Sequence, residues 1–211
     1  MAVNIRTAYL GGSFDPPHLG HIALAREVVA RGLADEVWLA PAWQPPHKSR
    51  ALTPFADRLA MVELACENVS GVRACGDEAE FALEPSYTVE VLAKLTEKYP
   101  EREFCLLVGG DMLAEFHLWH RAEYLAAHYR ILAYPRRGTA VALVDLKRHW
   151  SEELAEKLHG SLMADLPFFD ISSTNIRNLL AKSGNADNII DAKVMNYINA
   201  AGLYRREGEK N

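Results

Sequence analysis

Two histidines and two adjacent glycines lie within residues 11–21, which read Gly-Gly-Ser-Phe-Asp-Pro-Pro-His-Leu-Gly-His. The ring nitrogens of His18 and His21 can donate hydrogen bonds to phosphate oxygens. Because the two residues lie three apart, they would share one face of a helix near its positively polarised N-terminus. Gly11 and Gly12 permit a close approach between the backbone and a ligand. The segment therefore predicts a phosphate-binding site, although a capped helix with two exposed histidines would read similarly.

A second segment with anion-binding chemistry, residues 171–177, reads Ile-Ser-Ser-Thr-Asn-Ile-Arg. The hydroxyl of Ser172, Ser173 or Thr174 can cap the helix that begins there, and the free amides of the first turn add to an anion site. Arg177 lies one turn further along, with a permanent charge in a fork that suits phosphate. Alone this pattern is usually structural. Together with residues 11–21 it predicts that two helix N-termini bracket a polyphosphate.

An alternation of short apolar runs with segments of helical period positions these residues as far as about Arg136. The pattern predicts strands over residues 7–10, 37–40, 72–75, 104–108 and 130–134, and helices over residues 18–31, 55–66, 88–99, 172–182 and 191–201. Residues 137–159 read as polar, irregular and partly helical. The expected fold is one α/β domain, residues 1–211, with a doubly wound Rossmann-like parallel sheet and a C-terminal helical part over residues 172–204. Ligands bind such sheets at the carboxyl ends of the strands.

Composition and charge narrow the class of protein. With 49% hydrophobic and 24% charged residues in 211, the chain is typical of a globular protein. A net charge of −5 argues against nucleic acid or an anionic membrane surface as a partner. The sequence shows neither a secretory signal nor a membrane-spanning run, so we expect a cytoplasmic protein. Cys66, Cys75 and Cys105 are widely spaced and are interpreted as core thiols. A homo-oligomeric state is left open.

These segments resemble a known family. Residues 18–21 match the HxGH signature of nucleotidylyltransferases, and the fuller pattern is similar to that of bacterial nicotinate-nucleotide adenylyltransferases. The matches are PPHK at residues 45–48, SYT at 86–88, GxD at 109–111, the tryptophan Trp119, ISSTxIR at 171–177 and YIxxxGLY at 197–204. Two departures are Arg136-Arg137-Gly138, where the family has an arginine followed by Pro-Gly, and Trp43-Gln44, where an asparagine is expected before the prolines.

The resemblance implies a role for each matched residue. The catalytic residues would be His18, His21 and Arg177. ATP and its phosphates would be bound by Gly11, Gly12, Ser13, Phe14, Lys48, Arg136, Ile171, Ser172, Ser173 and Thr174. The pyridine nucleotide would be bound by Ser86, Tyr87, Thr88, Gly109, Asp111 and Trp119.

Lys48, Asp111 and Trp119 have structural alternatives, and for Lys48 the alternative is an ordinary solvated loop lysine. Amides at the helix start after Tyr87 could receive the nicotinate carboxylate. Asp111 could accept from ribose hydroxyls or be a plain helix N-cap, and Trp119 could stack on the pyridine ring or belong to the core. His117 and His120 imitate a metal-binding pair without a third ligand and are interpreted as structural or rim residues. Arg58 reads as a surface or packing residue.

The implied reaction joins ATP to nicotinate mononucleotide, releasing pyrophosphate and making deamido-NAD in NAD biosynthesis. Mg²⁺ would arrive with ATP, bound mainly by phosphate oxygens and waters, without a dedicated protein metal site. Other acceptors for the same core are phosphopantetheine, nicotinamide mononucleotide and, with CTP, a polyol phosphate. An alternative from another class is a nucleotide-binding regulator without turnover.

Overall fold

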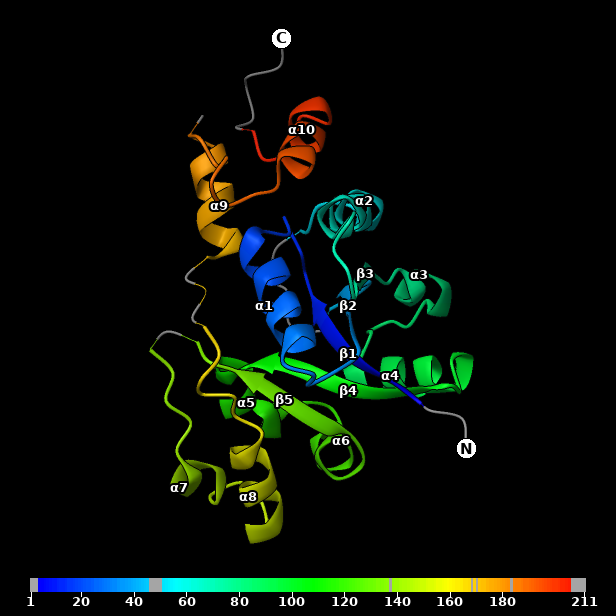
Figure 1. The fold of residues 1–211 in the computed structure, drawn as a ribbon, viewed down its shortest axis with the longest axis vertical. Helices are drawn as coiled ribbons and strands as arrows, with labels where there is room; N and C mark the ends of the chain where they lie inside the picture. The colour runs from blue at the N-terminus through cyan, green and yellow to red at the C-terminus, as the bar shows by residue number, and fades with distance from the viewer. Residues whose placement is uncertain are drawn as a thin grey trace.

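The computed structural model describes residues 4–45, 51–136, 138–167, 169, 171–182 and 184–205. Five parallel strands form one sheet in the order β3-β2-β1-β4-β5 (Figure 1). They are β1 (Ile5–Gly12), β2 (Glu36–Pro41), β3 (Val72–Ala74), β4 (Arg102–Gly109) and β5 (Arg130–Tyr134). The strand order reverses direction between β1 and β4. The predicted doubly wound parallel sheet is therefore confirmed, and all five predicted strands are present.

Side chains of β1 alternate between two hydrophobic clusters, one on each face of the sheet. Ala8 and Leu10 belong to the first cluster, whereas Tyr9 belongs to the second. Tyr9 lies in register with Trp38 of β2 and Leu106 of β4, which point the same way. Burial on both faces explains why these strands read as near-continuous apolar runs in the sequence.

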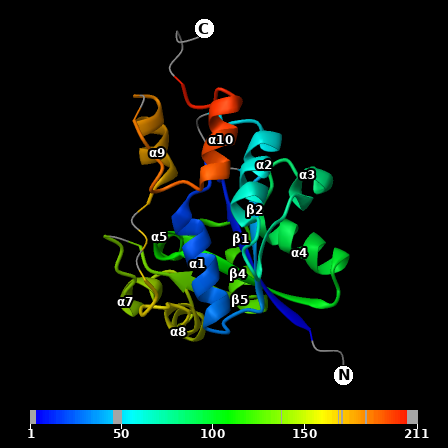
Figure 2. The same cartoon turned by 45° about the horizontal axis from the view of Figure 1, so that its top comes forward.

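Helices cover both faces of the sheet (Figure 2). The first cluster is covered by α1 (Leu19–Ala30), α2 (Phe55–Cys66), α9 (Ser173–Leu180) and α10 (Ala192–Ala200). The second is covered by α4 (Thr88–Lys98), α5 (Gly110–Ala114), the 3-10 helix η1 (Phe116–Leu118), α6 (Ala122–His128), α7 (Leu143–Leu146) and α8 (Glu152–Gly160). The short α3 (Asp77–Phe81) lies between β3 and α4. None of the helices in the described ranges is long and apolar enough to cross a bilayer.

Several elements differ from the sequence prediction. Residues 138–159 are partly helical as predicted, with α7 and most of α8, whereas α3, α5 and α6 were not predicted. Those three helices have five to seven residues, which is fewer than two turns and too short to show a helical period. The cysteines were interpreted correctly: all three are buried and free, and burial raises the pKa of the Cys105 thiol to about 11.

The C-terminal helices attach to the loop between β1 and α1. Arg177 Nη1 donates to the Asp15 carbonyl oxygen at 2.6 Å, and the Tyr204 hydroxyl donates to Asp15 Oδ1 at 2.7 Å. Ser173 Oγ donates to the Pro16 carbonyl oxygen at 2.8 Å. The bonds from Ser173 and Arg177 place the N-terminus of α9 beside the histidine-containing loop, across separations of 157 and 162 residues in the chain.

Candidate active site

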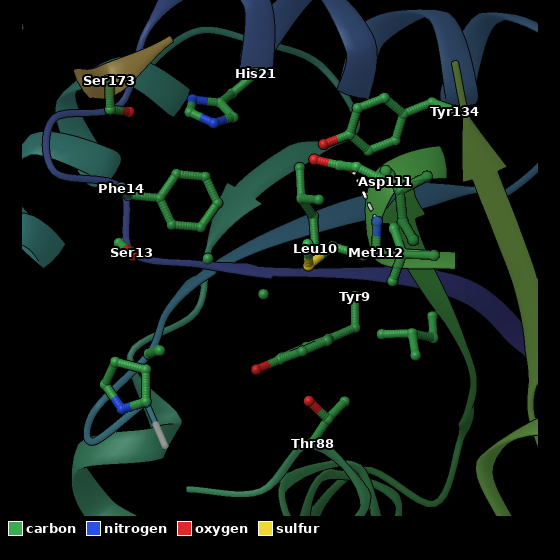
Figure 3. Close-up of a pocket in the computed structure, with 18 of the residues that line it drawn as sticks. Tyr9, Leu10, Ser13, Phe14, His21, Thr88, Asp111, Met112, Tyr134 and Ser173 are labelled. Carbon is green, nitrogen blue, oxygen red and sulfur yellow. Dashed lines mark hydrogen bonds between the residues drawn. The ribbon is translucent and has the colours of Figure 1, made fainter. Parts of the chain in front are cut away.

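A cavity of about 710 Å³ opens at the carboxyl ends of β1 and β4, where the strand order reverses. Figure 3 shows His21, Phe14 and Ser173 on one side of β1, and Tyr9 and Thr88 on the other. Lys48 lies outside the described residues. The other predicted site residues all line the cavity: Gly11, Gly12, Ser13, Phe14, His18, His21, Ser86, Tyr87, Thr88, Gly109, Asp111, Trp119, Arg136, Ile171, Ser172, Ser173, Thr174 and Arg177.

The two histidines stack at the N-terminus of α1, with ring centroids 3.6 Å apart. The sequence predicted that His18 begins the helix. In the structure His18 precedes the first turn as the extended N-cap residue. Its backbone N–H donates to Nδ1 of His21 at 3.2 Å. Because Nδ1 of His21 accepts, a neutral His21 ring carries its proton on Nε2. A Cβ atom on Gly20 would lie 3.1 Å from the His18 ring, so glycine there allows the histidines to pack closely.

Burial keeps both rings uncharged in the ligand-free protein. Desolvation, followed by the charge of Arg136, lowers the pKa of His18 to about 3. Desolvation, with smaller contributions from His18 and Arg136, also places the pKa of His21 well below its ordinary value. Each ring at neutral pH is therefore a neutral hydrogen-bond donor, and a bound polyanion would favour its protonation.

The low pKa of His18 predicts acid-sensitive stability. The unfolded state binds a proton near pH 6.5 and the folded state only near pH 3, so the stabilisation is full above pH 6.5 and is lost as pH falls through this window. Between pH 7 and pH 4 the loss from this group is at most about 3 kcal/mol. Urea unfolding should show a smaller pH dependence for His18→Gln, while exposed His159 provides the control His159→Gln. Equal pH dependence of the unfolding free energy in His18→Gln and wild type would contradict this role of His18.

Asp111 and Arg136 follow β4 and β5 at the same edge of the sheet. Asp111 Oδ1 accepts from the Met112 backbone N–H at 3.0 Å and lies 3.8 Å from Arg136 Nε. The N-cap residue of α5 is Gly109, so the alternative reading of Asp111 as an N-cap is wrong. A Cβ atom on Gly109 would collide with the Asp111 carboxylate. Glycine at this position therefore lets the carboxylate fold back over the strand end.

The N-terminus of α9 is the place where the second anion site is predicted. Ser172, one of the three capping residues that the sequence left open, is the N-cap, and its Oγ accepts from the Asn175 backbone N–H at 3.4 Å. Arg177 Nη2 donates to Thr174 Oγ1 at 3.0 Å, in addition to the bond from Nη1 to the Asp15 carbonyl oxygen. The guanidinium is thus held in place on the cavity wall.

The predicted pyridine end is formed by the start of α4 and the segment after η1. Tyr87 is the extended N-cap residue of α4, so the first-turn amides lie at the cavity. The half-buried Trp119 lines the cavity while its ring packs edge-on against Phe116 at 5.1 Å. His120 stacks on Tyr87 at 4.2 Å.

His117 and His120, which imitate a metal-binding pair in the sequence, have different surroundings in the structure. His117 stacks on His149, with ring centroids 3.7 Å apart, whereas His120 lines the cavity. Among the residues that the structure describes, we find no cluster of three His, Cys, Asp or Glu side chains that could hold a metal.

Sequence reasoning missed three polar residues at the cavity and left a fourth, Arg58, as either a surface or a packing residue, of which the packing alternative is correct. Tyr9, Glu78 and Tyr134 line the cavity. Tyr9 and Tyr134 come from strands next to predicted site residues, which could have indicated them, whereas Glu78 belongs to the unpredicted α3. Arg58 is no surface residue: only 2% of it is exposed, and it donates to three backbone carbonyls.

Comparison with known proteins agrees with this arrangement. The cytidylyltransferase-like family model matches residues 9–179. A protein of Anaeromyxobacter dehalogenans named "Probable nicotinate-nucleotide adenylyltransferase" is 38% identical over 200 residues, with 94% of this chain and 96% of the relative covered. One of the same name from Bacteroides thetaiotaomicron is 38% identical over 196 residues, covering 92% and 91%.

A solved structure shares the fold. The nicotinic acid mononucleotide adenylyltransferase of Plasmodium falciparum, complexed with NaAD, has a TM-score of 0.73 and 20% sequence identity, with 95% of this chain and 97% of that one covered. The similarity of the curated sequences over nearly their full length, joined to the site just described, places the chain in a family. The chain belongs to the nicotinate-nucleotide adenylyltransferases.

Proposed function

We propose that this chain transfers the adenylyl group of ATP to nicotinate mononucleotide, making deamido-NAD and pyrophosphate in NAD biosynthesis. The observation that carries this proposal is the cavity itself. It brings the N-termini of α1, α9 and α4 around one space of about 710 Å³, within the range of sites for small molecules. Two of these helix ends suit a polyphosphate, and the third suits a small carboxylate.

The reaction needs little proton chemistry. A 5′-phosphate, with a second pKa near ~6, is mostly dianionic at neutral pH and needs no general base. One of its oxygens attacks the α-phosphorus of ATP in line, the bond from that phosphorus to the bridging oxygen breaks, and pyrophosphate leaves. His18 and His21 stabilise the charge on the transferring group, while Arg177 and the α9 N-terminus hold pyrophosphate.

Mg²⁺ fits this scheme as a companion of ATP. Phosphate oxygens and waters are its usual ligands at such sites, and the described part of the chain offers no dedicated cluster of metal ligands. The metal, when bound, would offset charge on the phosphates. Among the residues that the structure describes, Arg136 and Arg177 are the arginines that line the same cavity.

Pyrophosphate release tests this function directly. The protein would be incubated with ATP, Mg²⁺ and one acceptor at a time: nicotinate mononucleotide, nicotinamide mononucleotide, phosphopantetheine or a polyol phosphate. We expect the fastest release with nicotinate mononucleotide. Fastest release with phosphopantetheine or a polyol phosphate would refute the pyridine-nucleotide assignment, and no release with any acceptor would indicate a binding protein.

Replacement of Arg177 by lysine should impair the use of ATP. Lysine keeps the charge but loses the planar fork that contacts Asp15 and Thr174 while facing the cavity. Loss of one charge-assisted hydrogen bond costs about 1.5 to 3 kcal/mol, so kcat/KM for ATP should fall at least about tenfold. Arg26→Lys, at an exposed position of α1, is the control. Unchanged ATP kinetics in Arg177→Lys would return this arginine to a structural role.

A further inference from the structure

One peptide group lies between two buried side chains of opposite charge. Arg58 Nη2 donates to the Ala42 carbonyl oxygen at 2.9 Å, and the Trp43 backbone N–H donates to Glu78 Oε2 at 2.9 Å. That carbonyl and that N–H belong to the same planar peptide group. Only 2% of Arg58 and 4% of Glu78 are exposed. Each charge therefore compensates the other through a single backbone unit that directly follows β2.

The arginine also reaches the phosphate end of the cavity. Its Nη1 donates to the Ser13 carbonyl oxygen at 3.0 Å, and its Nε donates to the Thr53 carbonyl oxygen at 2.9 Å. Ser13 lies in the loop that leads to the histidines and lines the cavity. Arg58 thus joins the loop after β1, the loop after β2 and the start of α2.

The glutamate reaches the pyridine end. Its Oε1 accepts from the Tyr9 hydroxyl at 2.5 Å. Burial raises the pKa of Glu78, while hydrogen bonds from Tyr9, Trp43 and Ser86 and the charge of Arg58 oppose that rise. Glu78 therefore holds β1 and the loop after β2 against the residues that precede α4.

Two reciprocal hydrogen bonds link the loop after β2 to the residues that precede α4. Gln44 N–H donates to Ser86 Oγ at 3.1 Å, and Ser86 N–H donates to the Gln44 carbonyl oxygen at 3.0 Å. Ser86 begins the predicted Ser-Tyr-Thr segment at the N-terminus of α4. A shift of the peptide group between Ala42 and Trp43 would therefore move the wall that faces the pyridine ring.

We propose that Arg58 and Glu78 are paired positioning residues that hold the Ala42–Trp43 peptide group and so set the relative placement of the phosphate and pyridine ends of the cavity. This inference rests on the proposed function for its kinetic consequences. Its physical basis is that a buried charge is tolerated when opposite charges face it, and that removing Arg58 or Glu78 withdraws one of the charges that stabilise the other.

Arg58 contacts the phosphate end of the cavity and Glu78 the pyridine end, so their variants should affect the KM values of the two substrates unequally. Arg58→Lys should raise the KM for ATP at least about tenfold, because one ammonium cannot replace a fork that spans three carbonyls. Glu78→Gln keeps the shape but loses the charge, and should raise the KM for nicotinate mononucleotide by a similar factor. Each variant should raise the other substrate's KM by a smaller factor, because both residues hold the same peptide group. Matched controls are Arg26→Lys and Glu80→Gln, the latter at an exposed position in the same helix as Glu78.

Hydrogen exchange gives a readout that does not depend on turnover. The Trp43 amide should exchange at least about tenfold faster in Glu78→Gln than in wild type. In Glu80→Gln its exchange rate should equal that of wild type. If wild type transfers no adenylyl group but this exchange responds as expected, the proposed function fails while the pairing stands. Unchanged exchange together with unchanged KM values would overturn the pairing.

Coupling between the two residues is the final test. If they act as a pair, the double variant Arg58→Lys/Glu78→Gln should be less impaired than the product of the single effects; simple multiplication of those effects would overturn the proposal. Should Glu78→Gln not fold, Tyr9→Phe removes only the hydroxyl that Glu78 accepts from. It should raise the KM for nicotinate mononucleotide several-fold, and an unchanged KM would overturn the proposal equally.

Discussion

Replacement of His21 by alanine is expected to lower kcat by roughly 100- to 1,000-fold, the usual effect of removing one preorganised donor from a site of developing charge. The structure explains why the donor is preorganised. Nδ1 of His21 accepts from the His18 backbone N–H, so the proton lies on Nε2. Stacking on His18 and the edge contact with Phe14, at 4.8 Å, fix the plane of the ring. His18→Ala should lose kcat for the same reason.

The same hydrogen bond complicates the experiment. His21 satisfies a backbone donor at the start of α1, so His21→Ala should also lose about 0.5 to 2 kcal/mol of stability. Turnover must therefore be measured at saturating substrates on protein shown to be folded by circular dichroism. His159→Ala, in α8 and exposed, is the matched control. Near-normal kcat in folded His21→Ala would remove the histidine from the proposed transition state.

A preference for nicotinate over nicotinamide mononucleotide is the second large effect, at least roughly 100-fold in kcat/KM. First-turn amides of α4, after Tyr87, can each donate to a carboxylate. A carboxamide has one oxygen and one NH₂ group, so its NH₂ would oppose one of these donors. An unsatisfied buried donor costs about 1 to 3 kcal/mol, and the loss of a charge-assisted bond adds to this cost.

The backbone origin of this preference can be tested separately. Both mononucleotides would be compared in kcat/KM at saturating ATP and Mg²⁺. Thr88→Ala keeps the amide and removes the side chain, so the variant should retain the preference even where its absolute rate falls. Equal kcat/KM for the two mononucleotides in wild type would remove the nicotinate preference and leave adenylyl transfer standing. Loss of preference in Thr88→Ala alone would transfer the selectivity to the hydroxyl.

The sequence by itself determined the sheet and the segments that meet at its carboxyl edge. The part of a parallel strand that is buried on both faces, such as residues 104–108 of β4, must be apolar throughout, and this pattern is local. Helix N-termini likewise have local signals: a cap was predicted among Ser172, Ser173 and Thr174, and Ser172 provides it. A doubly wound sheet binds ligands at one known edge, and this placed residues 11–21 at the site. Residues 171–177, in a helix that does not follow a strand, were joined to them only by their matching anion-binding chemistry.

Only the tertiary structure decided what lies beneath the cavity and how it is charged. From the sequence, Arg58 could be interpreted only as a surface or packing residue. In the structure it donates to backbone carbonyls, and such acceptors have no sequence signature. Glu78 belongs to a helix of five residues, too short to be recognised by period. The lowered pKa of His18 comes mainly from burial and then from Arg136, at the end of another strand. Burial and charge pairing depend on distant segments, so a local pattern cannot show them.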